Sequence, residues 1–419
     1  MAKSSSNEIV AGLDIGSSSV RVAVGQRSSS AGGRESIQII GAAEAPSVGV
    51  NKGVITSIED AISSVSTCLE KVERMTGVQI ERAFVGISGS HIVSQESKGV
   101  VAVSRSDGEI REEDVERALE AARTVATPLN YEILHVLPKS FIVDGQSGIK
   151  DPVGMTGIRL EVDAQIIQSL SSQLKNLSKC VYRTGIEIDD VVLGILAASE
   201  AVASSRQKEL GVAVANIGSS TTSLAVYEDG DVLRTVVLPI GSDHITSDVA
   251  IGLRTSIEVA ERVKVEHGLA SSREAKREDI RLADLGAEED EVVSKKFVAE
   301  IIEARVEEIF GKIDKELKKI DRSGRLPAGI ILTGGGAKLN GLVDMAKTEL
   351  RLPAALGYPV NVSSITDRTN DIAFSTAVGL VLWGHHLSEN ARGQNGLASK
   401  FGDLQVGSRF KKLLRSLLP

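Results

Sequence analysis

Apolar and polar positions follow the same pattern in two distant stretches of the chain. "LDIGSSSVRVAV" occupies residues 13–24 and "ANIGSSTTSLAV" occupies residues 215–226, and six of their twelve positions match without a gap. Each has an apolar run, a Gly-Ser turn and then alternating residues, which predicts a β-hairpin. A stretch of helical periodicity follows each hairpin, at residues 57–77 and 246–268. Chance similarity of two Ser-rich turns is the alternative, but the shared order favours an internal duplication into two related α/β halves.

Other segments interrupt or extend these two halves. Short predicted strands and the helical stretch "REEDVERALEAARTVA" indicate a small α+β subdomain inserted in the first half. A charged helical region in the second half indicates a peripheral subdomain with solvated faces. We therefore expect six parts: a first core at 1–83 and 163–200, an inserted α+β subdomain at 84–162, a second core at 201–240 and 324–386, a peripheral helical or α+β subdomain at 241–323, a flexible linker at 387–407 and a terminal helix at 408–419.

Composition narrows the class of protein. The chain has 419 residues with a formal charge of -8, and no basic domain stands out, which argues against a nucleic-acid partner. Its start lacks the apolar run of a signal peptide, and no stretch approaches the roughly 18 apolar residues of a membrane-spanning helix. Cys68 and Cys180 are far apart and lack metal-ligand spacing, so we expect inert thiols in a reducing compartment. These features predict a cytoplasmic protein.

Three glycine-rich turns, at Gly16, Gly218 and Gly334, follow apolar strands. Backbone N–H groups and hydroxyls in Gly-Ser turns suit phosphate oxygens, so the two hairpins together could hold a polyphosphate. Asp14 ends the first strand, where a carboxylate could hold Mg²⁺ through water. In the third turn, successive glycines allow the backbone to approach a ligand where a helix begins. Each turn alone is more often structural, but the three in one duplicated chain predict nucleotide binding.

The final twelve residues, "SRFKKLLRSLLP", are basic and rich in leucine although the chain is acidic. On a helix their apolar side chains form one stripe and the basic ones cover the rest. So short a peptide is barely helical in water, and its two faces fit a helix lying on an anionic lipid membrane. A helix folded back onto the protein's own core is the alternative. The predicted membrane contacts are Phe410, Lys411, Lys412, Leu413, Leu414, Arg415, Leu417 and Leu418.

These features resemble the actin, hexokinase and heat-shock chaperone ATPase superfamily, and within it the FtsA family of bacterial cell-division proteins. The resemblance extends from residue 9 to residue 384 and adds the tail. It rests on "GLDIGSSSVRV", "HVLPKSFIVDGQSGIKDPVGMTGIRLEVDAQII", "LPIGSDHITSDVAIGLRTSIEVAERVKVEHG", "ILTGGGAKLNGL" and "STAVGLVLWG". It implies a duplicated actin/ribonuclease-H-like α/β fold with an inserted α+β subdomain and a C-terminal amphipathic helix. ATP and Mg²⁺ would lie between the halves.

The resemblance also assigns site residues. A first phosphate loop would place Asp14, Gly16, Ser17 and Ser18 at the phosphates, with Asp14 at the metal. The second phosphate loop would comprise Gly218, Ser219, Ser220 and Thr221, and the adenosine loop Gly335, Gly336 and Lys338. Glu261 and Lys264 would approach the nucleoside; without the resemblance, they would be a solvated helical pair.

The second loop departs from the superfamily pattern. That loop usually has an Asp and several glycines, where this chain has "NIGSS" beginning at Asn216. A neutral Asn removes one carboxylate from the metal environment, and the added side chains restrict close approach of the backbone. We therefore expect ATP binding with slow or absent hydrolysis.

The resemblance implies an adaptor that self-associates head to tail into filaments and holds the FtsZ ring to the membrane. Contacts of this heterologous kind do not close, so they extend into filaments. The FtsZ C-terminal tail would dock on the peripheral subdomain, where Arg305 is a candidate contact and a solvated helix face is the alternative. Other division proteins would bind the inserted subdomain. The expected location is the cytoplasmic face of the cell membrane at the division septum. A related pilus-assembly ATPase scaffold and a small-molecule kinase on the same fold are the alternatives.

Overall fold

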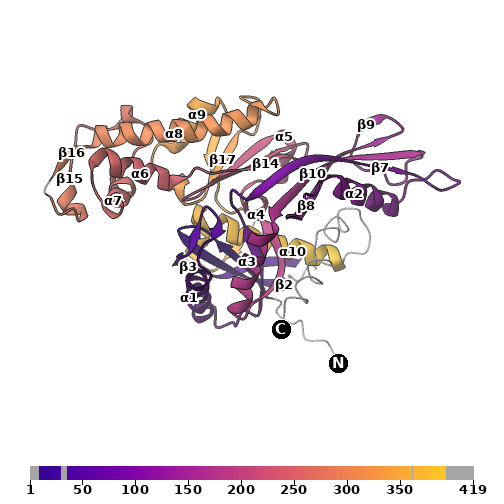
Figure 1. The fold of residues 1–419 in the computed structure, drawn as a ribbon, viewed down its shortest axis with the longest axis horizontal. Helices are drawn as coiled ribbons and strands as arrows, with labels where there is room; N and C mark the ends of the chain where they lie inside the picture. Colours follow the sequence, from indigo (N-terminus) through magenta and orange to yellow (C-terminus); the bar gives the residue numbers. More distant parts are fainter. Residues whose placement is uncertain (1–8, 30–34, 290, 361, 393–419) are drawn as a thin grey trace.

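The computed structural model describes residues 9–29, 35–289, 291–360 and 362–392, and two sheets with the same strand order form its centre (Figure 1). The first sheet has the order β11-β6-β1-β2-β3-β19 and the second β18-β17-β12-β13-β14. In both, a three-stranded antiparallel meander is followed by two strands parallel to its first strand. This repeated topology confirms the predicted duplication. The strands are β1 (Ile9–Ile15), β2 (Ser19–Ser29), β3 (Glu35–Pro46), β6 (Arg82–Ile87), β11 (Glu187–Leu193) and β19 (Ser363–Ser364), then β12 (Val212–Ile217), β13 (Thr222–Glu228), β14 (Asp231–Leu238), β17 (Ile330–Thr333) and β18 (Ala354–Leu356).

Helices cover both faces of the first sheet. On one face lie α1 (Ile58–Thr76) and α3 (Ser171–Arg183), and on the other α10 (Ser375–Arg392), with α4 (Gly194–Val202) packed against α10. The sequence defines α1 locally, because the Ser57 hydroxyl accepts a hydrogen bond from the Asp60 N–H and Gly77 ends the helix at φ 69°. Helix α10 approaches α4 closely through Gly379, where an added Cβ would lie 1.8 Å from the Ala197 carbonyl oxygen.

The inserted subdomain has its own sheet and core. Its strands, in the order β7-β10-β8-β9, are Ile92–Ala102, Arg159–Leu170, Tyr131–Val143 and Gln146–Ile149. Helix α2 (Glu112–Ala126) packs on β7 and β10, and the apolar side chains between them, such as Leu119 and Phe141, form a core separate from those of the two halves. This subdomain extends to one side of the molecule (Figure 1).

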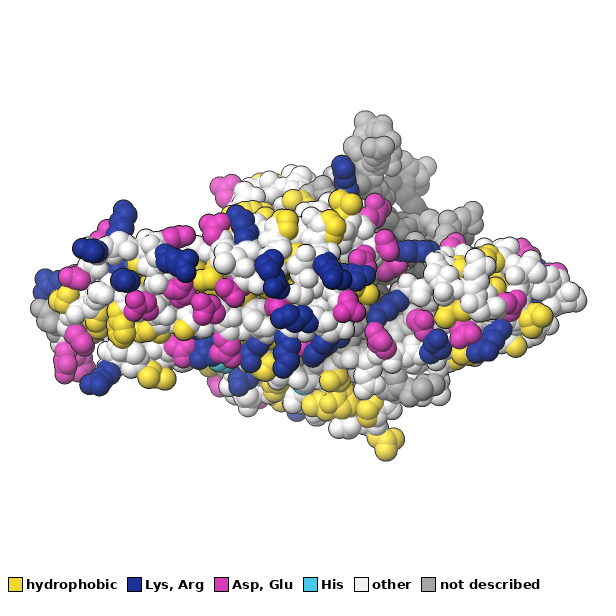
Figure 2. Space-filling model, turned by 90° about the horizontal axis from the view of Figure 1, so that it is seen from above, with side chains coloured by type: hydrophobic (Ala, Val, Ile, Leu, Met, Phe, Trp, Pro, Cys, Tyr) yellow, Lys and Arg dark blue, Asp and Glu magenta, His cyan; other side chains and the backbone are white. Residues whose placement is uncertain are grey.

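Helices of the second half extend to the opposite side (Figure 1). They are α6 (Ser242–Leu253), α7 (Ile257–His267) and α8 (Lys295–Lys318), beside a small ladder of β15 (Asp279–Arg281) and β16 (Val292–Ser294). Seen from above, basic side chains gather near the middle of the molecule (Figure 2). Lys312 and Lys318 of α8, and Lys319 just after it, pair with acidic side chains of the same helix. The three Lys side chains are largely exposed, but Asp314 and Glu316 are buried, so only the basic side of those two pairs faces solvent. The remaining elements are α5 (Ser205–Leu210), α9 (Leu342–Leu350), β4 (Val50–Asn51) and β5 (Val54–Ile55), with 3-10 turns at Ser272–Glu274, Leu282–Leu285, Gly335–Lys338, Asp367–Asn370 and Ile372–Phe374.

The C-terminal part of the described chain returns to the first half. The sequence interpretation placed residues 324–386 in the second core. Strands β17 and β18 within this range do belong there, but β19 pairs with β3 and α10 packs on β1, β2 and β6. Apolar periodicity predicts that a helix is buried, yet it does not say against which sheet. Helix α10 also continues to Arg392, so residues 387–392 are helical and not part of the flexible linker that the sequence predicted.

The tail falls outside this description. Residues 393–419, with the rest of the predicted linker and the predicted membrane contacts, lie outside the described residues. Within the described part of the chain, no helix has both the length and the hydrophobicity needed to cross a membrane.

Candidate nucleotide-binding cleft

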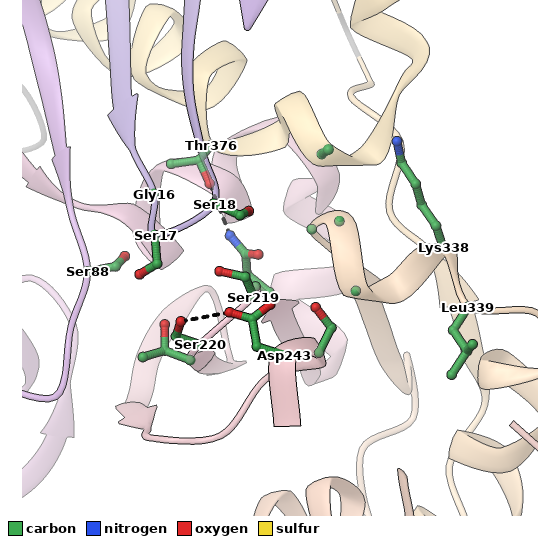
Figure 3. Close-up of a pocket in the computed structure, with 18 of the residues that line it drawn as sticks. Gly16, Ser17, Ser18, Ser88, Ser219, Ser220, Asp243, Lys338, Leu339 and Thr376 are labelled. Carbon is green, nitrogen blue, oxygen red and sulfur yellow. Dashed lines mark hydrogen bonds between the residues drawn. The ribbon is translucent and has the colours of Figure 1, made fainter. Parts of the chain in front are cut away.

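A cleft of about 520 Å³ lies where the two duplicated halves meet. All the residues assigned to the nucleotide by resemblance line it, although they come from distant parts of the chain. They are Asp14, Gly16, Ser17, Ser18, Gly218, Ser219, Ser220, Thr221, Glu261, Lys264, Gly335, Gly336 and Lys338. In Figure 3, Ser17 and Ser18 lie on one side and Ser219 and Ser220 on the other, with Lys338 and Leu339 farther along. The structure thus brings the three predicted loops together around one space.

The first loop is the turn between β1 and β2. The Gly16 N–H donates to the Ser19 carbonyl at 3.1 Å, and an added Cβ at Gly16 would lie 2.9 Å from that oxygen. Glycine therefore permits the tight turn. The Ser17 hydroxyl accepts a hydrogen bond from the Gly53 N–H at 3.1 Å. This bond ties the loop to the segment that follows β4.

The second loop, between β12 and β13, is bonded to the start of α6. The Ser242 and Asp243 N–H groups donate to the carbonyls of Gly218 and Ser219 at 2.9 and 2.8 Å. The Ser220 hydroxyl donates to Asp243 Oδ2 at 3.1 Å (Figure 3). These bonds use two of the free N–H groups that a helix presents at its N-terminus. Hydrogen bonds to the start of α6 therefore fix the conformation of this loop.

The third loop follows β17 and forms a 3-10 turn, Gly335–Lys338, where the sequence predicted the start of a helix; α9 begins only at Leu342. Gly334 has φ 87°, and an added Cβ would lie 2.2 Å from Asn216 Oδ1. The Lys338 ammonium pairs with Asp371 at 2.6 Å. Burial raises the pKa of the Asp371 carboxyl, but the hydrogen bonds from Lys338 and the Ala373 N–H outweigh it and leave that pKa below its usual value.

A row of charged residues crosses the first sheet beneath the cleft. Asp14 on β1 is paired in register with Arg21 on β2, and Arg21 with Glu44 on β3. Arg21 Nε donates to Glu44 at 3.1 Å. Burial raises the pKa of Asp14 to about 6, and the Arg21 charge opposes this rise. Within the described residues there is no group of three His, Cys, Asp or Glu side chains that could hold a metal ion. Asp14 is a single carboxylate in the cleft, and Mg²⁺ in nucleotide sites commonly takes one or two carboxylates together with phosphate and water oxygens.

Glu261 and Lys264 lie on α7, line the cleft and form an ion pair with each other. Lys264 Nζ lies 2.6 Å from the Glu261 carboxylate and 2.8 Å from Thr246 Oγ1, and its residue is 9% exposed. A buried Lys with these partners differs from the solvated helical pair that spacing alone predicts.

Asn216 is bonded across the cleft. Its side-chain amide donates to Thr376 Oγ1 at 3.0 Å, and Thr376 belongs to the first turn of α10 on the first sheet. Other cleft residues that sequence reasoning missed are Ser88, Asp243, Arg21 and Glu44. Asp243 could have been found from "IGSD", a helix start after a strand, whereas Ser88 and Thr376 carry no local signal.

The candidate partner contact lies away from this cleft. Arg305 on α8 is bound by Asp248 of α6, with Nε to Oδ2 at 2.5 Å and a second nitrogen to Oδ1 at 2.9 Å. Glu308 lies on its other side. About a quarter of its side chain remains exposed.

Comparisons with known proteins place this architecture in a family. Residues 89–168 match the SHS2 domain inserted in FtsA, and residues 213–379 match the cell division protein FtsA. The chain is 40% identical to FtsA of Bacillus subtilis over 90% of its length and 83% of that protein, and 36% identical to FtsA of Pseudomonas aeruginosa over 92% and 91%. It is 32% identical to FtsA of Escherichia coli K12 over 99% and 98%.

The chain belongs to the FtsA family of cell-division proteins. Solved structures agree on the fold. A PilM-PilN type IV pilus biogenesis complex matches with a TM-score of 0.65 at 15% identity, over 90% of this chain and 98% of that one. MreB5 of Spiroplasma citri bound to ADP matches with a TM-score of 0.54 at 13% identity, over 93% and 99%. The actin-like fold predicted for this FtsA-family chain is therefore confirmed. The two matching MreB5 structures are bound to ADP and to AMPPNP.

Proposed function

We propose that this chain binds ATP with Mg²⁺ in the cleft between its halves and serves as a membrane-attached scaffold of the division ring. The observation that carries the proposal is the cleft itself, which three glycine-containing loops and both duplicated halves enclose. Family membership supports the division role. The likeness to nucleotide-bound actin-like proteins supports the choice of ligand.

In this proposal each loop has one task. N–H groups and hydroxyls of Gly16, Ser17 and Ser18 bind one side of the polyphosphate and Gly218 to Thr221 the other. Asp14 would hold Mg²⁺ through water, and the ion would supply positive charge that offsets the charge of the phosphates. Gly335, Gly336 and Lys338, with Glu261 and Lys264, contact the adenosine. Asn216 offers no carboxylate, so hydrolysis is slow.

The scaffold has three further proposed contacts. Copies self-associate head to tail into filaments. The FtsZ C-terminal tail docks on the peripheral subdomain of residues 241–323 and reaches Arg305. Other division proteins bind the inserted subdomain, whose sheet begins at Ile92 and ends at Leu170. The helix of residues 408–419 attaches the chain to the cytoplasmic face of the membrane at the septum, with residues 393–407 as the linker.

Flotation on vesicles containing anionic lipid tests the attachment. The full chain and a chain ending at Gly407 are compared at low and high salt. We expect only the full chain to float, and less of it as salt rises, because basic side chains near anionic lipid each contribute about 1 kcal/mol that salt screens. If the two chains floated to the same extent, residues 408–419 would not be the membrane anchor.

Titration with ATP tests the cleft separately. The full chain is titrated with ATP, with and without Mg²⁺, and with AMP as a control that lacks the polyphosphate. Binding of ATP well above that of AMP is expected, because two loops contact phosphates. No binding of either nucleotide would refute the nucleotide site, whatever the outcome with vesicles.

A further inference from the structure

A second, much smaller cavity lies behind the first phosphate loop. Its volume is about 10 Å³, close to the space that one water molecule requires. Ile15, Gly53 and Ser88 line both this cavity and the nucleotide cleft, so these residues form the wall between the two. His91 and Gln173 line this cavity but not the cleft.

Two side chains that line this cavity have polar atoms without a partner among the described residues. Within that part of the chain neither ring nitrogen of His91 makes a hydrogen bond, although the residue is only 8% exposed. The buried Oε1 atom of Gln173 also lacks a partner among the described residues. Burial lowers the pKa of His91 to about 4, so its ring is neutral near pH 7, with one nitrogen that donates and one that accepts. The large majority of buried polar groups in proteins are hydrogen-bonded, to the protein or to an internal water.

We propose that this cavity is a site for one ordered water molecule that bonds to His91 and to Gln173 Oε1. A water molecule can donate to the amide oxygen and bond to either kind of imidazole nitrogen, so one molecule serves both side chains. The volume admits one water and little else.

The position of the two residues gives this water a role. His91 immediately precedes β7, by which the chain enters the inserted sheet, and Gln173 lies in the first turn of α3, directly after β10, by which the chain leaves it. The water therefore joins the two connections between the inserted subdomain and the first half. Because the Gly53 N–H is bonded to the Ser17 hydroxyl, a shift of the phosphate loop moves the wall of the same cavity.

We infer that the water site transmits nucleotide binding to the inserted subdomain; this part of the inference rests on the proposed nucleotide site. The connections at His91 and Gln173 are the covalent links of the inserted sheet to the first half. A change at the Ser17 loop thus has a short physical route to β7, through Gly53 and Ser88, that does not depend on the second half of the molecule.

A crystal structure of the full chain, at a resolution that shows ordered water, tests the site. We expect density for one water within hydrogen-bond distance of His91 and Gln173 Oε1, and none there in His91→Phe, whose ring fills similar space without nitrogens. A dry cavity in the unaltered chain would overturn the proposal. Gln173→Leu gives a second test should His91→Phe fold poorly. Gln165→Leu is the matched control, since Gln165 also has an unpartnered buried Oε1 but does not line this cavity.

Hydrogen exchange measured by mass spectrometry tests the transmission. ATP with Mg²⁺ is expected to slow exchange in β7 of the unaltered chain and of Gln165→Leu, and this slowing is lost in His91→Phe and Gln173→Leu while ATP affinity stays within about threefold. An unchanged response in both variants would overturn the transmission. Failure of the unaltered chain to bind ATP would instead refute the proposed function, and the crystal structure would still decide whether the water is present.

Discussion

The side-chain amide of Asn216 donates a hydrogen bond to Thr376 Oγ1, so a residue of the second sheet is bonded to the helix that covers the first. The bond lies at the wall of the nucleotide cleft. Its donor is the neutral group that replaces the Asp usual in the superfamily. The same position therefore links the two halves and places no carboxylate in the cleft.

Asn216→Asp is expected to increase ATP hydrolysis. The Thr376 hydroxyl can donate to a carboxylate as readily as it now accepts from the amide, so the contact between the halves survives. The added carboxylate can orient or deprotonate attacking water, an effect typically worth 10²–10⁴-fold in rate, and we expect at least about tenfold. Phosphate release measures the rate. Thr376→Val, which removes the bond without adding charge, is the control, and an equal rate in both variants would contradict the role of the missing carboxylate.

Asp14 is expected to destabilise the nucleotide-free protein at high pH. Its folded-state pKa of about 6 exceeds its ordinary value of 3.8. A carboxyl with a raised pKa favours folding when protonated, so its contribution is fully present below about pH 3.8 and is lost as the pH rises through about 6. Two pKa units correspond to about 3 kcal/mol. Asp14→Asn should thus raise the free energy of unfolding by up to about 3 kcal/mol near pH 8.

Urea unfolding of the nucleotide-free chain near pH 8 and near pH 4 measures this effect. Near pH 4 the two proteins should differ little, because Asp14 is then largely protonated. Asp367→Asn, at an exposed site, is the control. A stabilisation that is equal at both pH values would show that the cost does not come from ionisation of Asp14. Asp14→Asn should also bind ATP with Mg²⁺ more weakly, because Asp14 would then lower the stability of the protein and strengthen nucleotide binding.

Gly53→Ala is expected to damage both stability and nucleotide binding. Gly53 has φ 73°, and an added Cβ would lie 1.8 Å from the Ser88 carbonyl oxygen. Gly77 has a similar φ of 69° but open space around it, so Gly77→Ala reports the backbone strain alone, about 1 kcal/mol. We expect Gly53→Ala to cost about 3 kcal/mol or more, because Ser88 must also move. Thermal unfolding and ATP titration of both variants make the comparison, and equal losses would contradict a close packing role for Gly53.

Arg305→Ala is expected to weaken binding of an FtsZ C-terminal tail peptide by about tenfold, the loss of about 1.4 kcal/mol. Arg322→Ala is matched to it. Each Arg binds a carboxylate through two nitrogens, Asp248 for Arg305 and Glu228 for Arg322, and the two side chains are similarly exposed. Both variants should therefore lose similar stability. If they also lost peptide affinity equally, or not at all, Arg305 would not be a contact.

The sequence could predict those parts of the site whose conformation depends on a few neighbouring residues. Gly16 and Gly218 each follow an apolar strand at a tight turn, and a turn that needs glycine is visible in a short stretch of sequence. Ser88 and Thr376 reach the cleft only because β6 pairs with β1 and α10 packs on the first sheet, and no short stretch records those contacts. Lys264 shows the same limit, because helical spacing places it beside Glu261 but does not reveal its burial against Thr246. The glycines of the third turn were visible in the sequence, whereas Glu261 and Lys264 were assigned to the nucleoside through resemblance alone.

The return of α10 to the first sheet has a consequence for how the protein is made. Phe374, Ala377 and Val381 complete the same apolar core as Leu13 and Val20. On the ribosome, β1 and β2 are synthesised first, but the residues that cover one face of their sheet emerge only after the strands of both halves. The first sheet therefore keeps part of one apolar face uncovered until α10 has been synthesised, so the amino-terminal half cannot complete its core before the rest of the fold has been translated.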